Sequence, residues 1–217
     1  MLMNSLEYAR ENDIIVLSPE YHQFYHNRAN GEIELLYMIF DVPETMKKIN
    51  VHQYLNLVKY LPDYMSSKLK FWDSLKELDT TIVGVYDRKS FNSYGDAYIH
   101  WTLPKQFFEP AEMIDGSINK SVFSFLNSFS DLVYSHKAKF YITFPGYQDI
   151  SFDNSKKQIN LIYEKLKTDG FILLGTPERY RMPDSLMFDA AYHPTKKGVD
   201  LRTSLIIEDL KRVINLN

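Results

Sequence analysis

The sequence predicts an α/β fold, with a parallel sheet covered by helices on both faces in a three-layer arrangement. Two observations favour it. Segments with apolar residues at helical spacing alternate with short, continuous apolar runs at residues 14–17, 140–144 and 171–174, which are typical of strands buried on both faces. The 217 residues also contain no linker, repeat or low-complexity stretch, so we expect a single domain over residues 1–217.

Composition narrows the class of partner. The chain has 25 Lys and Arg against 28 Asp and Glu and no contiguous basic block, so nucleic acid is not an expected partner. It has no cysteine, which excludes thiol catalysis, disulfides and thiolate metal sites. It has no leader-like start and no run of about 18 apolar residues. We therefore expect no membrane segment and a cytoplasmic location for the chain as written, or cell-envelope association if an N-terminal part is missing.

The order of elements follows from periodicity and from the residues that break it. In the first half we expect a helix over 1–11, a strand over 14–17, a helix over 32–40, a helical insertion at about 44–79 that Pro62 divides, a short strand over 80–86 and an aromatic-rich loop over 86–110. In the second half we expect a helix from Ser117, as N-cap, to about 136, a strand over 140–144, a helix over 154–167, a strand over 171–174 and a last helix from about Gly198.

The most informative pair is Asp189 and His193, which lie in the loop before the last helix. An Asp that accepts a hydrogen bond from the Nδ1–H of a His leaves Nε2 free to take a proton from a nucleophile. The loop after a late strand is also where open α/β sheets carry their chemistry. The same spacing occurs by chance, with Asp189 capping a turn and His193 solvated, and both interpretations stay open.

Three segments together resemble the SGNH/GDSL-type hydrolases, in particular the bacterial branch associated with acyl groups on cell-surface polysaccharides. They are residues 188–193 (Phe-Asp-Ala-Ala-Tyr-His) with Gly198 and Arg202-Thr203 after them, residues 18–21 (Ser-Pro-Glu-Tyr), and residues 91–96 (Phe-Asn-Ser-Tyr-Gly-Asp). The resemblance covers most of the chain.

The resemblance implies a flavodoxin-like three-layer sheet and acyl transfer from an ester to water or to a sugar hydroxyl. It implies His193 as the general base, Asp189 as its orienting carboxylate, and no metal or cofactor. The partner implied is a carbohydrate or an acylated small molecule. The residues implied to contact the substrate are Ser18, Glu20, Tyr21, Asn92 and Tyr192.

The sequence departs from the family where the nucleophile should stand. No strand ending in a G-D-S or G-x-S-N turn precedes residues 14–17, so we expect an N-terminally truncated sheet, a chain that is inactive or a fragment, and self-association through an unpaired edge at 14–17. Glu20 replaces the family's Asn and would oppose an oxyanion. As substitute nucleophiles, Ser117 is better explained as an N-cap, and Ser18 is followed by Pro19, which lacks the N–H of an oxyanion hole.

Two alternatives remain. His22 and His26, with Glu20, would form a two-His-one-carboxylate metal site if their segment were helical, although the aromatics around them and Pro19 favour a loop. The other alternative is a non-catalytic carbohydrate-binding or scaffold protein that uses the same cleft.

Overall fold

The structure is a computed structural model that describes residues 2–74 and 90–215. Its main strand pair is β1 (Ile14–Leu17) and β2 (Lys139–Ile142), which run parallel. A shorter parallel pair joins β3 (Tyr147–Gln148) to β4 (Arg181–Met182). The chain thus has the mixed α/β character that the alternating pattern predicted. The strand expected at 80–86 and the end of the helical insertion lie outside the described residues.

Strand β2 also contacts the segment predicted as a strand at 171–174, which is much shorter than predicted. The backbone N–H of Ile142 donates to the carbonyl of Ile172 at 3.0 Å, and the N–H of Leu174 donates to the carbonyl of Ile142 at 2.8 Å. These two bonds form a single parallel bridge between Ile142 and Leu173. Gly170 and Gly175, at φ +84° and +74°, turn the chain on either side, so the extended segment is too short for a ladder.

The prediction that residues 14–17 form a strand buried on both faces is wrong. Ile14 and Val16 are 41% and 38% exposed, whereas Phe140 and Ile142 of β2 are buried. Strand β1 is paired with β2 along its whole length, from Ile14 opposite Lys139 to Leu17 opposite Ile142, and within residues 2–74 and 90–215 no strand pairs with its other edge. Self-association through that edge stays a prediction. Because β1 has a strand neighbour on one side, its alternate side chains, Ile14 and Val16, remain partly exposed to solvent.

The described helices are α1 (Leu2–Ser5), α2 (Ile33–Asp41), α3 (Val51–Val58), α4 (Leu61–Ser74), α5 (Lys120–Ser135), α6 (Asp149–Asn154), α7 (Lys156–Thr168) and α8 (Lys196–Asn215). The helices predicted at 32–40 and within the insertion are confirmed as far as residue 74. The helix predicted over 1–11 is shorter, because α1 gives way to a 3-10 turn at Leu6–Tyr8.

Helix α5 begins at a different cap from the one predicted. Asn119 is its N-cap, and the Asn119 side chain accepts from the N–H of Ser121 at 2.9 Å. Ser117 lies two residues before this cap, and its carbonyl accepts from the N–H of His26 at 3.2 Å. A long-range backbone contact thus determines where the helix starts.

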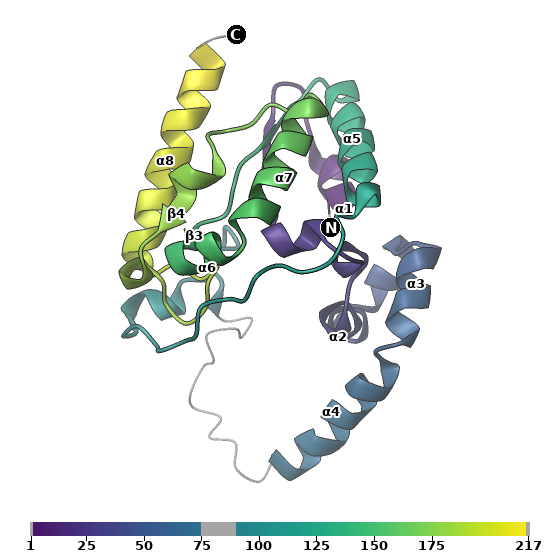
Figure 1. Cartoon of the computed structure of the whole chain (residues 1–217). Helices are drawn as coiled ribbons and strands as arrows, with labels where there is room; N and C mark the ends of the chain where they lie inside the picture. The colour runs from purple at the N-terminus through teal and green to yellow at the C-terminus, as the bar shows by residue number, and fades with distance from the viewer. Residues whose placement is uncertain (1, 75–89, 216–217) are drawn as a thin grey trace.

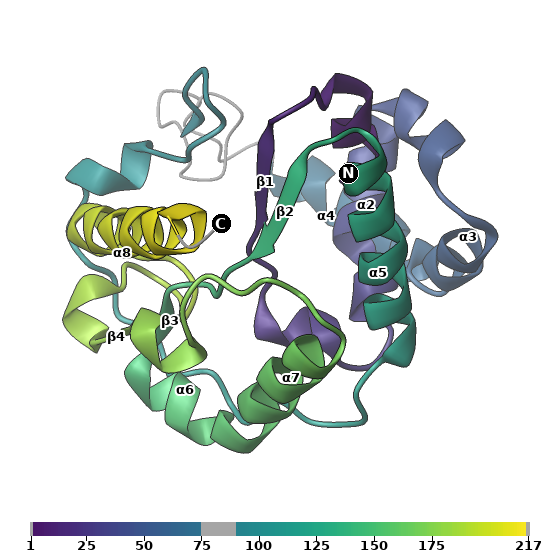
Figure 2. The same cartoon turned by 90° about the horizontal axis from the view of Figure 1, so that it is seen from above.

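Helices flank the strands on both sides. In Figure 2, β1 and β2 lie between α8 on one side and α5 on the other. The core between these elements is rich in aromatic and branched residues, among them Phe129, Val133, Phe140, Ile159 and Ile162.

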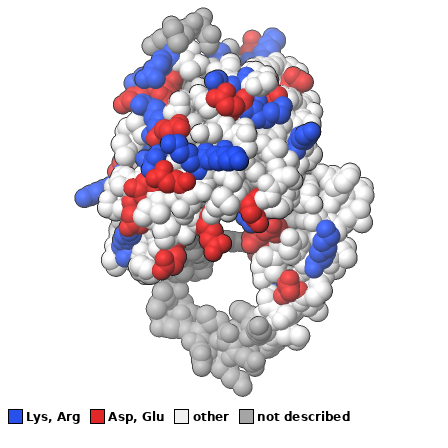
Figure 3. Space-filling model, in the orientation of Figure 1, with Lys and Arg blue, Asp and Glu red and all other residues white. Residues whose placement is uncertain are grey.

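Helices α2, α3 and α4 lie together on the side away from α8 and have a small core of their own, made by Leu36, Ile39, Leu57 and Tyr64 (Figure 1). The face in Figure 3 carries interspersed acidic and basic side chains over most of the body and few of either over this helical part. None of the helices within residues 2–74 and 90–215 combines the length and the apolar content needed to cross a membrane.

Candidate active site

The predicted Asp–His pair is formed in the loop that leads into α8. His193 Nδ1 lies 2.8 Å from Asp189 Oδ1. The backbone holds this geometry, because the N–H of Phe188 donates to the carbonyl of His193 at 2.7 Å and Met187 bridges Pro194 across the loop. The side chain of Asp189 is 22% exposed and that of His193 is 41% exposed. The carboxylate is therefore sheltered while the imidazole remains accessible, as a base that meets a substrate requires.

Ser18 follows the carboxyl end of β1, where a side chain of α8 contacts both Ser18 and the chain after β2. The guanidinium of Arg202, in α8, donates from the same nitrogen to Ser18 Oγ at 2.7 Å and to the carbonyl of Phe144 at 3.2 Å. Burial lowers the pKa of Arg202 from its usual value. The hydroxyl of Ser18 thus accepts from a cation that joins the two strand ends to α8.

Tyr21 and Tyr192 come together in an aromatic cluster. The backbone N–H of Tyr21 donates to the hydroxyl of Tyr192 at 3.1 Å, and the Tyr192 ring stacks on Tyr147 with centroids 4.3 Å apart. Burial raises the pKa of both the Tyr21 and the Tyr192 phenol. Because Tyr21 is 1% exposed, its ring supports the site from within the core, and Tyr192 is the one that reaches a cavity.

The residues proposed for a metal site do not converge. Glu20 Oε2 lies 3.3 Å from His22 Nε2, whereas His26 Nε2 lies 3.2 Å from Asp115 Oδ1. The chain makes a 3-10 turn at Tyr21–Phe24 and takes φ +51° at His26, so the two imidazoles do not share a helix face. In the part of the chain that the structure describes, no group of three or more metal-ligating side chains is found.

Asn92 organises its own loop. Its Oδ1 accepts from the N–H groups of Tyr94 and Asp96, both at 2.9 Å, and its Nδ2 donates to the Asp96 carboxylate. The same stretch of chain reaches the Asp–His loop through His100, whose Nε2 lies 3.2 Å from the carbonyl of Pro194. Asn92 therefore shapes a segment beside the site, and these side-chain hydrogen bonds stay within that segment.

Sequence reasoning missed a pocket of about 390 Å³ beside Tyr192. Its lining includes His22, Arg28, Glu112, Asp115, Tyr147 and Tyr192. The pocket exists because two distant segments pair: Tyr25 and Ile118 form an antiparallel bridge, and the N–H of Asn119 donates to the carbonyl of Phe24 at 2.8 Å. The letters Asp115-Gly116-Ser117, which resemble a nucleophile motif, are instead part of this pocket wall and of the turn behind it.

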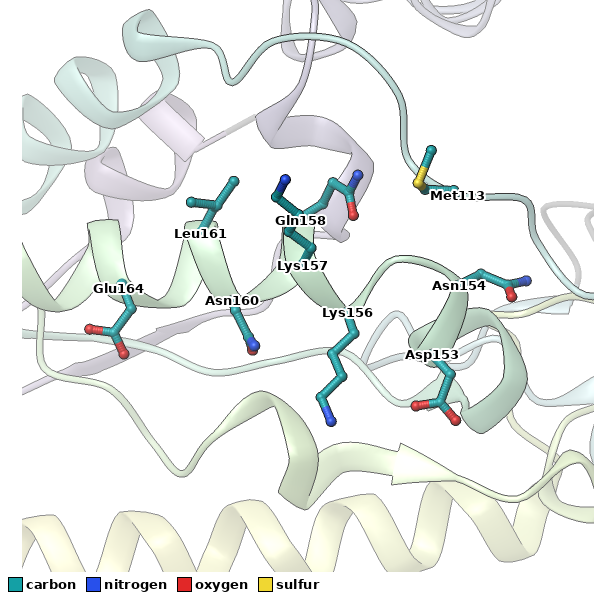
Figure 4. A pocket seen from close by; sticks show the side chains of 9 residues that line it. All are labelled: Met113, Asp153, Asn154, Lys156, Lys157, Gln158, Asn160, Leu161 and Glu164. Atoms are coloured by element: carbon teal, nitrogen blue, oxygen red, sulfur yellow. The ribbon is translucent and has the colours of Figure 1, made fainter.

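A larger hollow of about 650 Å³ lies along α7. Figure 4 shows that Gln158 and Leu161 point to the side of Met113, while Lys156 and Asn160 point away from it. Side chains that diverge from a helix surface cannot surround a ligand. We therefore treat this hollow as a surface groove and the pocket at Tyr192 as the candidate binding site.

Gly116 is required for the approach of His26 to this wall. It has φ +79°, and a Cβ there would collide with the imidazole of His26. We expect Gly116→Ala to lower the free energy of unfolding by about 2 kcal/mol, mostly through left-handed backbone strain, with a smaller loss from displacement of the half-exposed His26 ring from Asp115. Gly95→Ala is the matched control, since Gly95 has φ +86° and nothing within 4 Å of the added Cβ. Equal losses in urea unfolding of the two variants would show that the ring contact is unimportant.

The arrangement places an accessible imidazole against a sheltered carboxylate, and Tyr192, next in the chain to His193, lines a polar pocket. No family model, curated protein or solved structure matches the chain. The chemistry of the site therefore has to be argued from its own geometry.

Proposed function

We propose that this chain is an SGNH/GDSL-like acyl-ester hydrolase or acyltransferase domain directed at carbohydrates, with His193 as general base and Asp189 as its orienting carboxylate. The observation that supports the proposal is the 2.8 Å contact between His193 Nδ1 and Asp189 Oδ1 in the loop before α8. The parallel order of β1, β2 and Leu173, with helices on both sides, supports the finer proposal of a three-layer, flavodoxin-like fold.

The mechanism is acyl transfer through a serine ester. His193 Nε2 takes the proton of the attacking hydroxyl, Asp189 stabilises the imidazolium that forms, and the proton then passes to the leaving alcohol. Water or a sugar hydroxyl releases the acyl group in the second half. The serine itself is left unassigned, because Ser18 Oγ accepts from Arg202, and Ser117 lies in the irregular chain before α5 without a preceding strand.

Turnover of p-nitrophenyl acetate tests the base. His193 Nε2 can also deprotonate water against this activated ester, so we expect His193→Ala to lower turnover by about 10²-fold or more. His136→Ala is the control, because His136 is exposed at the end of α5, and its Nδ1 lies 2.8 Å from the Leu132 carbonyl. Equal rates for wild type and His193→Ala would remove the catalytic proposal.

A fluorophosphonate probe would identify the missing nucleophile. We expect mass spectrometry to find one modified serine in the wild type and a strongly reduced yield in His193→Ala, because the base activates that hydroxyl. The same yield in both proteins would show that the labelled serine does not depend on His193.

A non-catalytic carbohydrate-binding protein is the second candidate. The stacked rings of Tyr147 and Tyr192 at a polar pocket favour it, because aromatic rings and nearby polar groups are suited to sugars. Sugar binding without any ester turnover that depends on His193 would select this candidate over the enzyme.

A further inference from the structure

We propose that the pocket at Tyr192 is the subsite that holds a neutral sugar unit of the substrate, and this inference rests on the proposed carbohydrate-directed function. Tyr192 lines the pocket and is followed directly by His193, whose side chain forms the Asp–His pair. A ligand in the pocket therefore lies beside the loop that carries the base. A volume of about 390 Å³ is within the range of small-molecule binding sites.

The charges around the pocket favour a neutral ligand. Three of its cationic or ionisable groups already face carboxylates: His26 Nε2 lies 3.2 Å from Asp115 Oδ1, and Arg28 Nε lies 4.0 Å from Glu32 Oε1. His22 is likewise 3.3 Å from Glu20. An anion would compete with these carboxylates, and a cation would compete with their partners. Hydroxyl groups both donate and accept, so a sugar can bond to either kind of side chain without breaking the pairs.

The pocket is also formed before any ligand arrives. The N–H of Ala111 donates to Ser151 Oγ at 2.8 Å, and the N–H of Ile114 donates to Ser155 Oγ at 3.0 Å. Both serines are fully buried. The wall over residues 111–115 is thereby fastened to α6 and to the residue before α7, so binding costs little ordering of the protein.

The methyl group of Ala111 reports on this pocket, and that of Ala138, buried in the main core, serves as an internal reference. We would titrate the full chain, labelled with ¹³C at alanine methyls, with N-acetylglucosamine and, separately, with galacturonate and inorganic phosphate. We expect N-acetylglucosamine to shift the Ala111 signal saturably and to leave Ala138 in place. Asp115→Asn and Arg28→Gln should each weaken this binding by about tenfold, through loss of a charge-assisted hydrogen bond.

Lys157→Gln, in the neighbouring groove on α7, is the control and should bind as the wild type does. His136→Ala should also bind normally, because His136 is exposed at the end of α5 and outside the pocket lining. The proposal is overturned by the absence of an Ala111 shift, by stronger binding of galacturonate or phosphate, or by binding that survives both pocket substitutions. If the sugar binds as expected while ester turnover is independent of His193, the catalytic proposal fails and the pocket assignment stands.

Discussion

Raising the pH from 9 to 11 should lower the free energy of unfolding by about 4 kcal/mol or more, because several buried phenols, Tyr180, Tyr21 and Tyr192 foremost, resist ionisation in the folded chain. Burial raises the pKa of Tyr180 to about 12 and raises those of Tyr21 and Tyr192 as well. In the unfolded chain these groups ionise near pH 10. The stability associated with their protonated form is therefore complete below pH 10 and is lost above it, at about 1.4 kcal/mol per pH unit for each tyrosine.

Urea unfolding followed by circular dichroism at several pH values would measure this loss. Tyr192→Phe removes one of these groups and should reduce the loss of stability between pH 9 and 11 by about 1.4 kcal/mol. Tyr94→Phe should leave it unchanged, since Tyr94 is 90% exposed. Constant stability up to pH 11, with tyrosinate absorbance rising in the folded protein, would show that these phenols are accessible to solvent.

Asp209→Ala should lower the free energy of unfolding by about 3 kcal/mol. Asp209, on α8, is 2% exposed, and its Oδ2 accepts from the Tyr180 hydroxyl at 2.7 Å and from Arg179 Nε at 3.0 Å. Removing the carboxylate leaves a buried phenol and a partly buried guanidinium without this acceptor. The expected loss stays at the low end for a buried pair, because Arg179 keeps its contact with Glu208 at 2.6 Å.

Glu208→Ala is the matched control for Asp209→Ala. Glu208 binds the same guanidinium, but its side chain is 60% exposed, so solvent screens the pair and the expected loss is below about 1 kcal/mol. Chemical unfolding of both variants at neutral pH makes the comparison. Losses of the same size would mean that burial of Asp209 adds nothing to its contribution.

Local sequence patterns were sufficient for the strand cores and for the Asp–His pair. A continuous apolar run marks β1 and most of β2, because a strand in a parallel sheet needs few polar side chains. Asp189 and His193 lie within one short loop before the last helix, and this spacing and position together indicated the contact, while the alternative of a turn cap and a solvated imidazole stayed open. The length of the strand predicted at 171–174 was overestimated, since the turns at Gly170 and Gly175 leave this segment one bridge to β2.

The pocket could not be predicted in this way, because its contacts join segments far apart in the chain. His26 and Asp115 are separated by 89 positions, and no periodicity connects them. The same long-range pairing moved the start of α5 from Ser117 to Asn119, because the Ser117 carbonyl bonds to His26. The conformation of a polar loop depends on the distant segments that it packs against, and the pattern of a single sequence does not identify those segments.

The guanidinium of Arg202 has a mechanical consequence for the base. Two residues separate His193 from α8. Six residues after the start of α8, Arg202 donates to Ser18 Oγ and to the Phe144 carbonyl, at the ends of two strands. These two hydrogen bonds resist a tilt of α8 relative to the strands. They therefore also restrain the loop before α8, which carries the imidazole of His193. Arg202 thereby helps to fix the position of the imidazole relative to the two strand ends.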